Sequence, residues 1–250
     1  MDAHAHLSDG SFEADLDLVV LKARENGLAA IVDCGLGLEG GLKSLSISER
    51  FRGYVYSTIG IDYGGPFSAS HEEIIKLILD NRSRIIGVGE VGLDYYTVKA
   101  REDRVRLIEV FKGFIELAEK LGFPIIVHSR SAGRDALEIL VENNAKKVLM
   151  HAFDGKASHA MKGVEAGFFF SIPPSVVRSP QKQKLAARLP IENILLESDS
   201  PVLGVDPFRR NEPADIVFSL REIARIKRID PEVVAEETTR NACKLFGLRL

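Results

Sequence analysis

The sequence predicts an α/β fold in which eight parallel strands close into a (β/α)₈ (TIM) barrel with an extra C-terminal helix. Short apolar runs alternate with amphipathic helical stretches from one end of the chain to the other. Most of these runs are apolar throughout, as expected for parallel strands that helices cover. A length of 250 residues suits one such barrel, so we expect residues 1–250 to form a single domain. An open doubly wound sheet is the alternative, but no Gly-x-Gly-x-x-Gly follows an early strand.

The expected strands are eight short runs, at residues 1–6, 28–34, 54–59, 85–91, 124–128, 148–151, 168–171 and 194–196. The first helical pattern between them carries Leu16, Val19, Val20 and Ala23, and it stops at Gly27. Apolar residues three and four apart form one buried helix face, and glycine is a common residue just after a helix end.

A longer helical pattern runs from Leu107 to Leu121 and stops at Gly122, shortly before Pro124. The last helix is expected to begin at Asp230 and Pro231, because aspartate is a good N-cap and proline suits the first helical position. We expect this helix to continue to about Gly247 and to pack on the outside of the barrel.

The composition of the chain limits the kinds of molecule that it can bind. Hydrophobic residues make up 45% and charged residues 28% of the chain, and the net charge is −3. This near-neutral charge argues against a protein that coats long nucleic acids, because such binding needs many Lys and Arg contacts to phosphate. It still allows a pocket for one phosphate or one strand end. No apolar run approaches the ~18–20 residues of a membrane span, so we expect no membrane partner, and we infer no obligate protein partner.

Cysteine content indicates the compartment. Cys34 and Cys243 lie in apolar sequence surroundings and are expected to be buried thiols, which fits a reducing environment. The histidine pair described next begins at residue 4, which leaves no room for a removable leader. We therefore expect a cytoplasmic protein.

Histidines and carboxylates gather where the predicted strands end. His4 and His6 are two residues apart on the first strand, so their side chains share one face. The other candidate ligands at strand ends are Glu90, His128, His151 and Asp199. In a TIM barrel, all these ends lie at one mouth, where the active site forms. The set therefore predicts a divalent metal site, with nitrogen and oxygen ligands that suit zinc, magnesium or manganese.

The size of this set favours two ions. Four imidazoles and two carboxylates exceed what one tetrahedral ion needs when a position is left for water. Two ions bridged by one carboxylate would use all six ligands. Such two-metal sites stabilise the attacking and leaving oxygens of a phosphoryl displacement.

Ordered motifs give a specific resemblance. The chain resembles TatD-family metal-dependent deoxyribonucleases through Asp2-Ala3-His4-Ala5-His6, Gly89-Glu90-Val91-Gly92-Leu93-Asp94, Pro124 to His128-Ser129-Arg130, His151-Ala152-Phe153-Asp154-Gly155 and Leu196-Glu197-Ser198-Asp199-Ser200-Pro201. Arg210-Asn211-Glu212-Pro213 and Asn241-Ala242-Cys243-Lys244-Leu245-Phe246 match later landmarks of that family. The resemblance extends over essentially the whole chain.

The resemblance implies a TIM-barrel hydrolase that cleaves phosphodiester bonds in DNA, often from the 3′ end, with two divalent metals. It implies that His4, His6 and Asp199 hold one ion, that His128 and His151 hold the other, and that Glu90 lies between them. One motif departs from the family. After the third strand the family usually reads Gly, an apolar residue, His, Pro, whereas this chain has Gly60-Ile61-Asp62-Tyr63.

We expect three of these residues to take part in catalysis. Asp199 is the best candidate to accept the proton of the attacking water, and Glu90 is expected to bridge the ions. Arg130 is expected to bind the phosphoryl group, because its planar guanidinium matches phosphate. Tyr95 and its neighbour Tyr96 either stack a base of the substrate or pack against the barrel rim. A basic rim is expected from Arg130, Arg134, Lys156, Arg178, Lys182, Arg209 and Arg210, several of which could be ordinary surface charges.

Other polar residues have two open interpretations. Asp2, Asp94 and Glu197 either orient the metal ligands or form ordinary loop and sheet hydrogen bonds. Asn211 and Glu212 are expected to cap a helix near Pro213. His71 and His159 lie in helical stretches and are expected at the surface.

Two other classes of function remain. A barrel metallohydrolase acting on a carboxylic ester, lactone or amide, including an aminoacyl-tRNA ester, would use the same activated water. A non-enzymatic scaffold would have lost ligands, and none of the six is missing.

Overall fold

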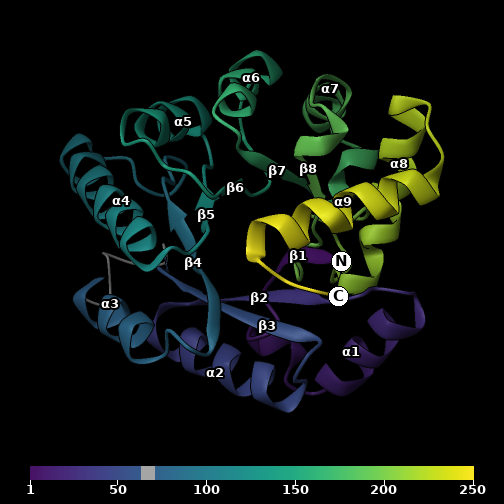
Figure 1. Cartoon of the computed structure of the whole chain (residues 1–250), viewed down its shortest axis with the longest axis horizontal. Coiled ribbons are helices and arrows are strands. Elements are labelled where there is room, and N and C mark those ends of the chain that lie inside the picture. The colour runs from purple at the N-terminus through teal and green to yellow at the C-terminus, as the bar shows by residue number, and fades with distance from the viewer. Residues whose placement is uncertain (63–70) are drawn as a thin grey trace.

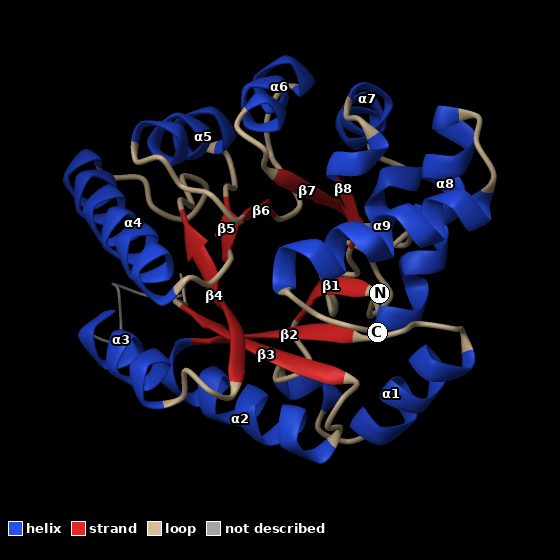
Figure 2. Ribbon diagram, viewed as in Figure 1, coloured by secondary structure: helices blue, strands red, loops and turns tan. Residues whose placement is uncertain are grey.

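Eight parallel strands form one sheet whose order follows the sequence. The computed structural model describes residues 1–62 and 71–250, and all statements on structure refer to these residues. The strands are β1 (Asp2–Ala5), β2 (Ile31–Leu36), β3 (Val55–Gly60), β4 (Ile85–Gly92), β5 (Ile125–His128), β6 (Val148–Met150), β7 (Phe169–Ile172) and β8 (Ile194–Leu196). The sheet curves into a nearly closed barrel, which confirms the predicted fold class (Figure 2).

Helices surround this barrel in chain order (Figure 1). They are α1 (Leu16–Glu25), α2 (Gly37–Arg50), α3 (His71–Asp80), α4 (Arg101–Leu121), α5 (Gly133–Glu142), α6 (Ala157–Glu165), α7 (Pro180–Arg188), α8 (Ile216–Lys227) and α9 (Pro231–Phe246). Short 3₁₀ helices are η1 (Gly10–Phe12), η2 (Pro174–Val177), η3 (Ile191–Asn193) and η4 (Pro213–Asp215). As predicted, Gly122 ends α4 in the left-handed conformation, with φ +69°.

The barrel closes between β1 and the segment after β8. Two backbone hydrogen bonds join them, from Asp199 N to His4 O (3.0 Å) and from His6 N to Ser200 O (2.8 Å). The carboxylate of Asp2 adds a third link, because its Oδ1 accepts a hydrogen bond from Ser198 N at 2.9 Å. Closure therefore brings the first strand and the segment after the last strand together at the residues expected to hold metal.

The strands separate two apolar clusters. One residue set faces the surrounding helices, and the alternate set faces the barrel interior. The interior cluster contains Val32, Ile126, Leu149, Phe169 and Leu195. Two positions further along, the same strands carry or lead into Cys34, His128, His151, Ser171 and Glu197. Because side chains alternate along each strand, apolar residues fill the barrel interior and polar residues follow them at the carboxyl ends of the strands.

The position of α9 differs from the expected one. Figure 2 shows α9 crossing one end of the barrel, beside the N-terminus, rather than lying along its flank. Ala242, Leu245 and Phe246 of α9 pack into the same cluster as Met1 and the interior residues. Its bounds agree with the prediction: Asp230 Oδ1 accepts a hydrogen bond from Glu232 N at 2.8 Å, and Gly247 follows with φ +68°. The helix closes the end of the barrel opposite the mouth.

None of the described helices combines the length and the apolarity needed to cross a bilayer.

Candidate metal centre

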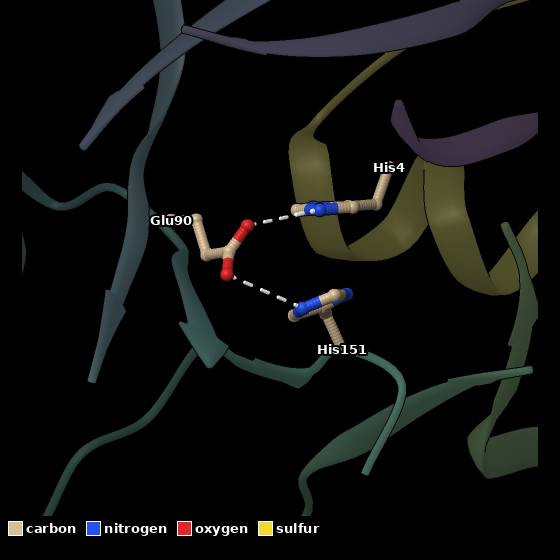
Figure 3. Close-up of side chains that lie close together, drawn as sticks. All are labelled: His4, Glu90 and His151. Carbon is tan, nitrogen blue, oxygen red and sulfur yellow. Dashed lines mark ion pairs between the residues drawn. The ribbon is translucent and has the colours of Figure 1, made fainter. Parts of the chain in front are cut away.

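The six predicted ligands converge at the carboxyl ends of the strands. Figure 3 shows the carboxylate of Glu90, from β4, with one oxygen directed at the imidazole of His4, from β1, and the other at that of His151, which directly follows β6. Glu90 Oε2 lies 3.2 Å from His4 Nε2, and Glu90 Oε1 lies 3.4 Å from His151 Nε2. The two oxygens of one carboxylate therefore face two different sets of imidazoles.

The first donor set has the dimensions of a tetrahedral metal site. His4 Nε2 lies 3.1 Å from His6 Nε2 and 3.4 Å from Asp199 Oδ1. His6 Nε2 lies 3.3 Å from Glu90 Oε2 and 3.5 Å from Asp199 Oδ1. Metal–ligand bonds of about 2.1 Å in a tetrahedron give donor separations of about 3.4 Å. The residues present fit a divalent ion at this position.

The second donor set lies on the other oxygen of Glu90. His128 Nδ1 contacts Glu90 Oε1, and the rings of His128 and His151 are stacked with centroids 5.7 Å apart. Glu90 Oε1 thus lies close to one ring nitrogen of His128 and one of His151. Three such donors would leave coordination positions of a divalent ion open, as is typical of catalytic metals.

Each imidazole is also held through its remaining ring nitrogen. The contacts are His4 Nδ1 to Cys34 Sγ (3.1 Å), His6 Nδ1 to Cys34 O (2.9 Å), His128 Nε2 to Asp94 Oδ2 (3.1 Å) and His151 Nδ1 to Glu197 Oε2 (3.3 Å). Partners of this kind fix the orientation of metal-binding imidazoles. The arrangement supports a metal centre independently of the donor distances.

Two interpretations were left open for Asp2, Asp94 and Glu197, and the structure gives Asp2 a different role from the other two. Asp94 and Glu197 contact ligand rings, and Glu197 also accepts hydrogen bonds from Ala152 N (2.8 Å) and Ser171 Oγ (2.5 Å). Asp2 accepts from the backbone N–H groups of His4 (3.2 Å) and Ser198, so it positions the chain rather than a ring.

Sequence reasoning missed Cys34. We expected only a buried thiol, whereas both its sulfur and its carbonyl oxygen hold ligand rings. The barrel order contained a signal, because β2 pairs with β1 and Cys34 lies near the end of β2.

Opposite charges balance inside this buried centre. Burial alone would raise the pKa of Glu90, but the neighbouring charges of His151 and His128 hold it well below its usual value. Burial lowers the pKa of His128, yet Glu90 and Asp94 raise it to about 9. The carboxylates are therefore ionised at neutral pH, and a divalent cation would replace protons on the imidazoles.

A cavity of about 370 Å³ opens beside the second donor set. His128, His151 and Asp199 line it, together with Arg130 and Lys182. This volume is within the range of small-molecule and cofactor sites.

The two tyrosines after β4 differ in their exposure. Tyr95 is half-buried against the main core, and the guanidinium carbon of Arg104 lies 4.3 Å from its ring centroid. Tyr96 is 56% exposed, and the guanidinium carbon of Arg130 lies 3.8 Å from its ring centroid. Of the two rings, Tyr96 is the more accessible to a base, while a role for Tyr95 in substrate binding stays a prediction.

A second cavity, of about 350 Å³, lies on the side of His6. Asp9 and Asp62 contribute carboxylates to its lining, so the position that departs from the family motif is at the mouth. Tyr63, the next residue of that motif, lies outside the described residues.

Much of the predicted basic rim is engaged in internal contacts. Arg209 pairs with Asp215 (2.6 Å), and Arg210 pairs with Asp15 (2.5 Å). Arg134 is exposed beside Asp135, at 3.2 Å. Lys182 is different, because it is buried and lines the cavity beside the candidate metal centre.

Of the two expected caps before α8, Glu212 is the N-cap of η4, and its backbone N–H donates to Asp215 Oδ2 at 3.2 Å. Asn211 does not cap this helix, contrary to our expectation. Its Nδ2 instead donates to Ser198 O (2.5 Å) and Val202 O (2.8 Å) on both sides of Asp199. His71 is exposed at the start of α3, and His159 is half-buried on α6.

The chain is similar to known proteins over almost its whole length. The sequence model of the family described as "TatD related DNase" matches residues 1–247. Deoxyribonuclease TATDN3 of Homo sapiens is 43% identical over 257 residues, covering 98% of this chain and 94% of that protein. The uncharacterized metal-dependent hydrolase YabD of Bacillus subtilis is 31% identical over 254 residues, covering 99% of this chain and 98% of its own.

A solved structure shows the same fold. The TatD homolog YJJV of Escherichia coli superimposes with a TM-score of 0.89 at 22% identity, covering 99% of this chain and 98% of that chain.

Proposed function

This chain belongs to the family of TatD-related DNases, and we propose that it is a divalent-metal-dependent deoxyribonuclease that hydrolyses phosphodiester bonds in DNA. The observation that carries this proposal is the position of Glu90, whose two oxygens face two separate sets of imidazoles. A bridging carboxylate of this kind suits a two-metal phosphoryl-transfer site.

We propose that the centre holds two ions. His4, His6 and Asp199 would hold one, His128 and His151 the other, and Glu90 both. The four imidazoles suit zinc best, while the two carboxylates also suit magnesium and manganese. Divalent ions supply the charge that polarises a phosphoryl oxygen and lowers the pKa of a water ligand.

The chain's own residues then position the reactants. Asp199, buried at the mouth with Oδ1 turned to the histidines, would accept the proton of the attacking water on its other oxygen. Arg130 would face the charge that develops on the phosphoryl oxygens, because its guanidinium lines the same cavity as Asp199. The exposed ring of Tyr96, against which Arg130 lies, would stack a base next to the scissile bond.

The cavity favours a strand end as substrate. A volume of about 370 Å³ holds a small number of nucleotides rather than a length of duplex. We propose that the protein removes nucleotides from the 3′ end of single-stranded DNA. We also propose that the protein works in a reducing compartment such as the cytoplasm, because Cys34 and Cys243 are both free thiols.

The test is to incubate metal-loaded protein with single-stranded DNA labelled at the 3′ or the 5′ end, with a nitrophenyl phosphodiester and with a nitrophenyl carboxylic ester. The proposal predicts EDTA-sensitive release of 3′-terminal mononucleotides and cleavage of the phosphodiester. Cleavage of the carboxylic ester alone would favour the esterase alternative, and products released first from the 5′ end would overturn the proposed polarity.

A further inference from the structure

Lys182 is a buried lysine beside the candidate metal centre. It lies in the first turn of α7, and its side chain is only 9% exposed. It lines the cavity of about 370 Å³ that also contains His151, Asp199 and Arg130. We expected Lys182 in a basic rim at the mouth or as an ordinary surface charge, so its burial needs a physical reason.

The hydrogen bonds of this ammonium group are incomplete. An ammonium has three N–H donors. Within residues 1–62 and 71–250, Lys182 Nζ has one acceptor, Ala152 O at 3.1 Å, and no ion pair. Burial lowers the pKa of Lys182, while Glu197, Asp199 and Asp154 favour its charged form from a distance. A buried cation without a direct partner is unfavourable, so a protein retains one where an anion binds.

A purely structural role does not require the charge. The adjacent Gln181 already joins α7 to the loop after β6, because its Nε2 donates to Phe153 O (3.2 Å) and Gly155 O (2.6 Å). A neutral donor at position 182 would serve the carbonyl of Ala152 equally well. The charge therefore points to a ligand rather than to the loop.

We propose that Lys182 binds a non-bridging oxygen of the substrate phosphate from inside the cavity, while Arg130 binds the same phosphate from the mouth. This inference rests on the proposed function, since the phosphate is that of the bond to be cleaved. A phosphodiester shares one negative charge between two non-bridging oxygens, and these oxygens can accept hydrogen bonds from both cations. A neutral carboxylic ester would leave the buried ammonium unpaired, so Lys182 makes the site selective for phosphodiesters.

Lys182→Met and Lys182→Gln test this role. The first removes the ammonium at similar length, and the second keeps a neutral donor for Ala152 O. Lys184→Met is the matched control, because Lys184 is exposed on the same helix. Gln181→Leu is the control for the loop, because it removes the contacts to Phe153 and Gly155 without changing the charge. Thermal unfolding identifies any variant that fails to fold.

The first measurement is calorimetric titration of metal-loaded protein with inorganic phosphate. Both Lys182 variants are expected to bind phosphate about tenfold or more weakly than the unmodified chain, while Lys184→Met stays within twofold. The second is hydrolysis of a nitrophenyl phosphodiester, for which KM rises by a similar factor in the Lys182 variants.

Two results would overturn the proposal: unchanged phosphate affinity in both Lys182 variants, or an equal loss of affinity in Gln181→Leu. These outcomes are separable from the proposed function. If Lys182→Met still cleaves DNA with an unchanged KM, the phosphate role fails and the nuclease stands. If phosphate affinity depends on Lys182 but no phosphodiester is cleaved, the nuclease fails and the phosphate role stands.

Discussion

Asp199 is held in place by its backbone conformation, by a backbone hydrogen bond and by the contacts of its carboxylate. Its backbone adopts φ +51°, its N–H bonds to His4 O, and its Oδ1 lies within 3.5 Å of two imidazole nitrogens. A non-glycine residue in the left-handed region is uncommon and is often associated with function. The local strain directs the carboxylate to the mouth of the barrel, where it meets His4 and His6.

The substitution Asp199→Asn removes the proton acceptor and one anionic donor while nearly preserving the shape of the side chain. We predict that kcat on 3′-labelled single-stranded DNA falls by about 10² or more, because general-base contributions are typically of that size. Circular dichroism and the thermal midpoint of the metal-free protein should stay close to those of the unmodified chain. Unchanged hydrolysis would remove Asp199 from the mechanism.

Asp33 gives a prediction on pH. It lies on β2, and its Oδ1 accepts hydrogen bonds from Leu7 N (2.7 Å) and Ser8 N (3.3 Å), just beyond His6. Burial raises the pKa of this carboxyl from 3.8 to about 6. The folded state thus favours the protonated form, so the contribution of Asp33 to stability is complete below about pH 4 and is lost as pH rises through 6.

In Asp33→Asn this dependence disappears, while an oxygen acceptor for Leu7 and Ser8 remains. The stability difference, unmodified chain minus variant, should therefore fall between about pH 4 and pH 6, by up to about 3 kcal/mol. Urea unfolding of both metal-free proteins across this range measures it. A difference that rises with pH would contradict the assigned direction.

Part of the site could be predicted residue by residue. The period of two along a strand places His4 and His6 on one face, and the barrel places the other ligands at the same mouth. Lys182 and the tyrosine pair could not be resolved in this way. Their burial depends on which neighbouring elements pack over them, and sequence spacing does not contain that information.

At the scale of elements, β3 and β4 approach each other closely where Glu90 enters the centre. A Cβ atom added at Gly60 would lie 2.0 Å from Glu90 O and 2.3 Å from Glu90 N. No L side chain fits this gap without moving the backbone of β4. Gly60, next to the residues that depart from the family motif, therefore determines the position of Glu90.

Gly60→Ala is predicted to destabilise the protein by about 2–3 kcal/mol, because overpacking in a rigid core has costs of this order. It should also reduce the metal content of the purified protein, since Glu90 must shift. The matched control is Gly113→Ala on the exposed face of α4, where an added Cβ meets nothing within 4 Å. That variant should gain about 0.5–1 kcal/mol through helix propensity. Denaturant unfolding and elemental analysis check both variants, and a Gly60→Ala protein with normal stability and metal content would contradict the argument.

The order and type of the elements could be predicted because apolar runs and helix stop signals alternate regularly along the chain. The location of α9 could not. Its apolar face predicts burial without stating which surface covers it. The structure gives the reason for its position: Leu245 and Phe246 fill the interior at the end of the barrel opposite the mouth.

At the scale of the whole molecule, charge is nearly balanced, and two cations line the cavity beside the candidate metal centre. The net charge is −3, and within the described residues Arg209 and Arg210 of the predicted rim are used in internal ion pairs. Arg130 and Lys182 line the cavity itself. This distribution of charge supports the proposal that the protein holds one end of a strand and not a long segment.

Salt dependence of binding measures this property. For single strands, log Kd changes with log salt by about 0.7 for each phosphate contact. Two or three contacts predict a slope of about 1.4–2 for a 3′-labelled oligonucleotide bound to Asp199→Asn, followed by fluorescence anisotropy. The slope should not change when the oligonucleotide is lengthened. A steeper slope that increases with length would indicate an extended binding surface.

The central claim is that His4, His6, Glu90, His128, His151 and Asp199 form one binuclear centre. Anomalous X-ray diffraction from crystals of zinc- or manganese-loaded protein tests it most directly. We expect two anomalous peaks about 3.5–4 Å apart, with Glu90 bonded to both, His4, His6 and Asp199 to one, and His128 and His151 to the other. A single peak, or an imidazole of this set outside bonding distance of both ions, would contradict it.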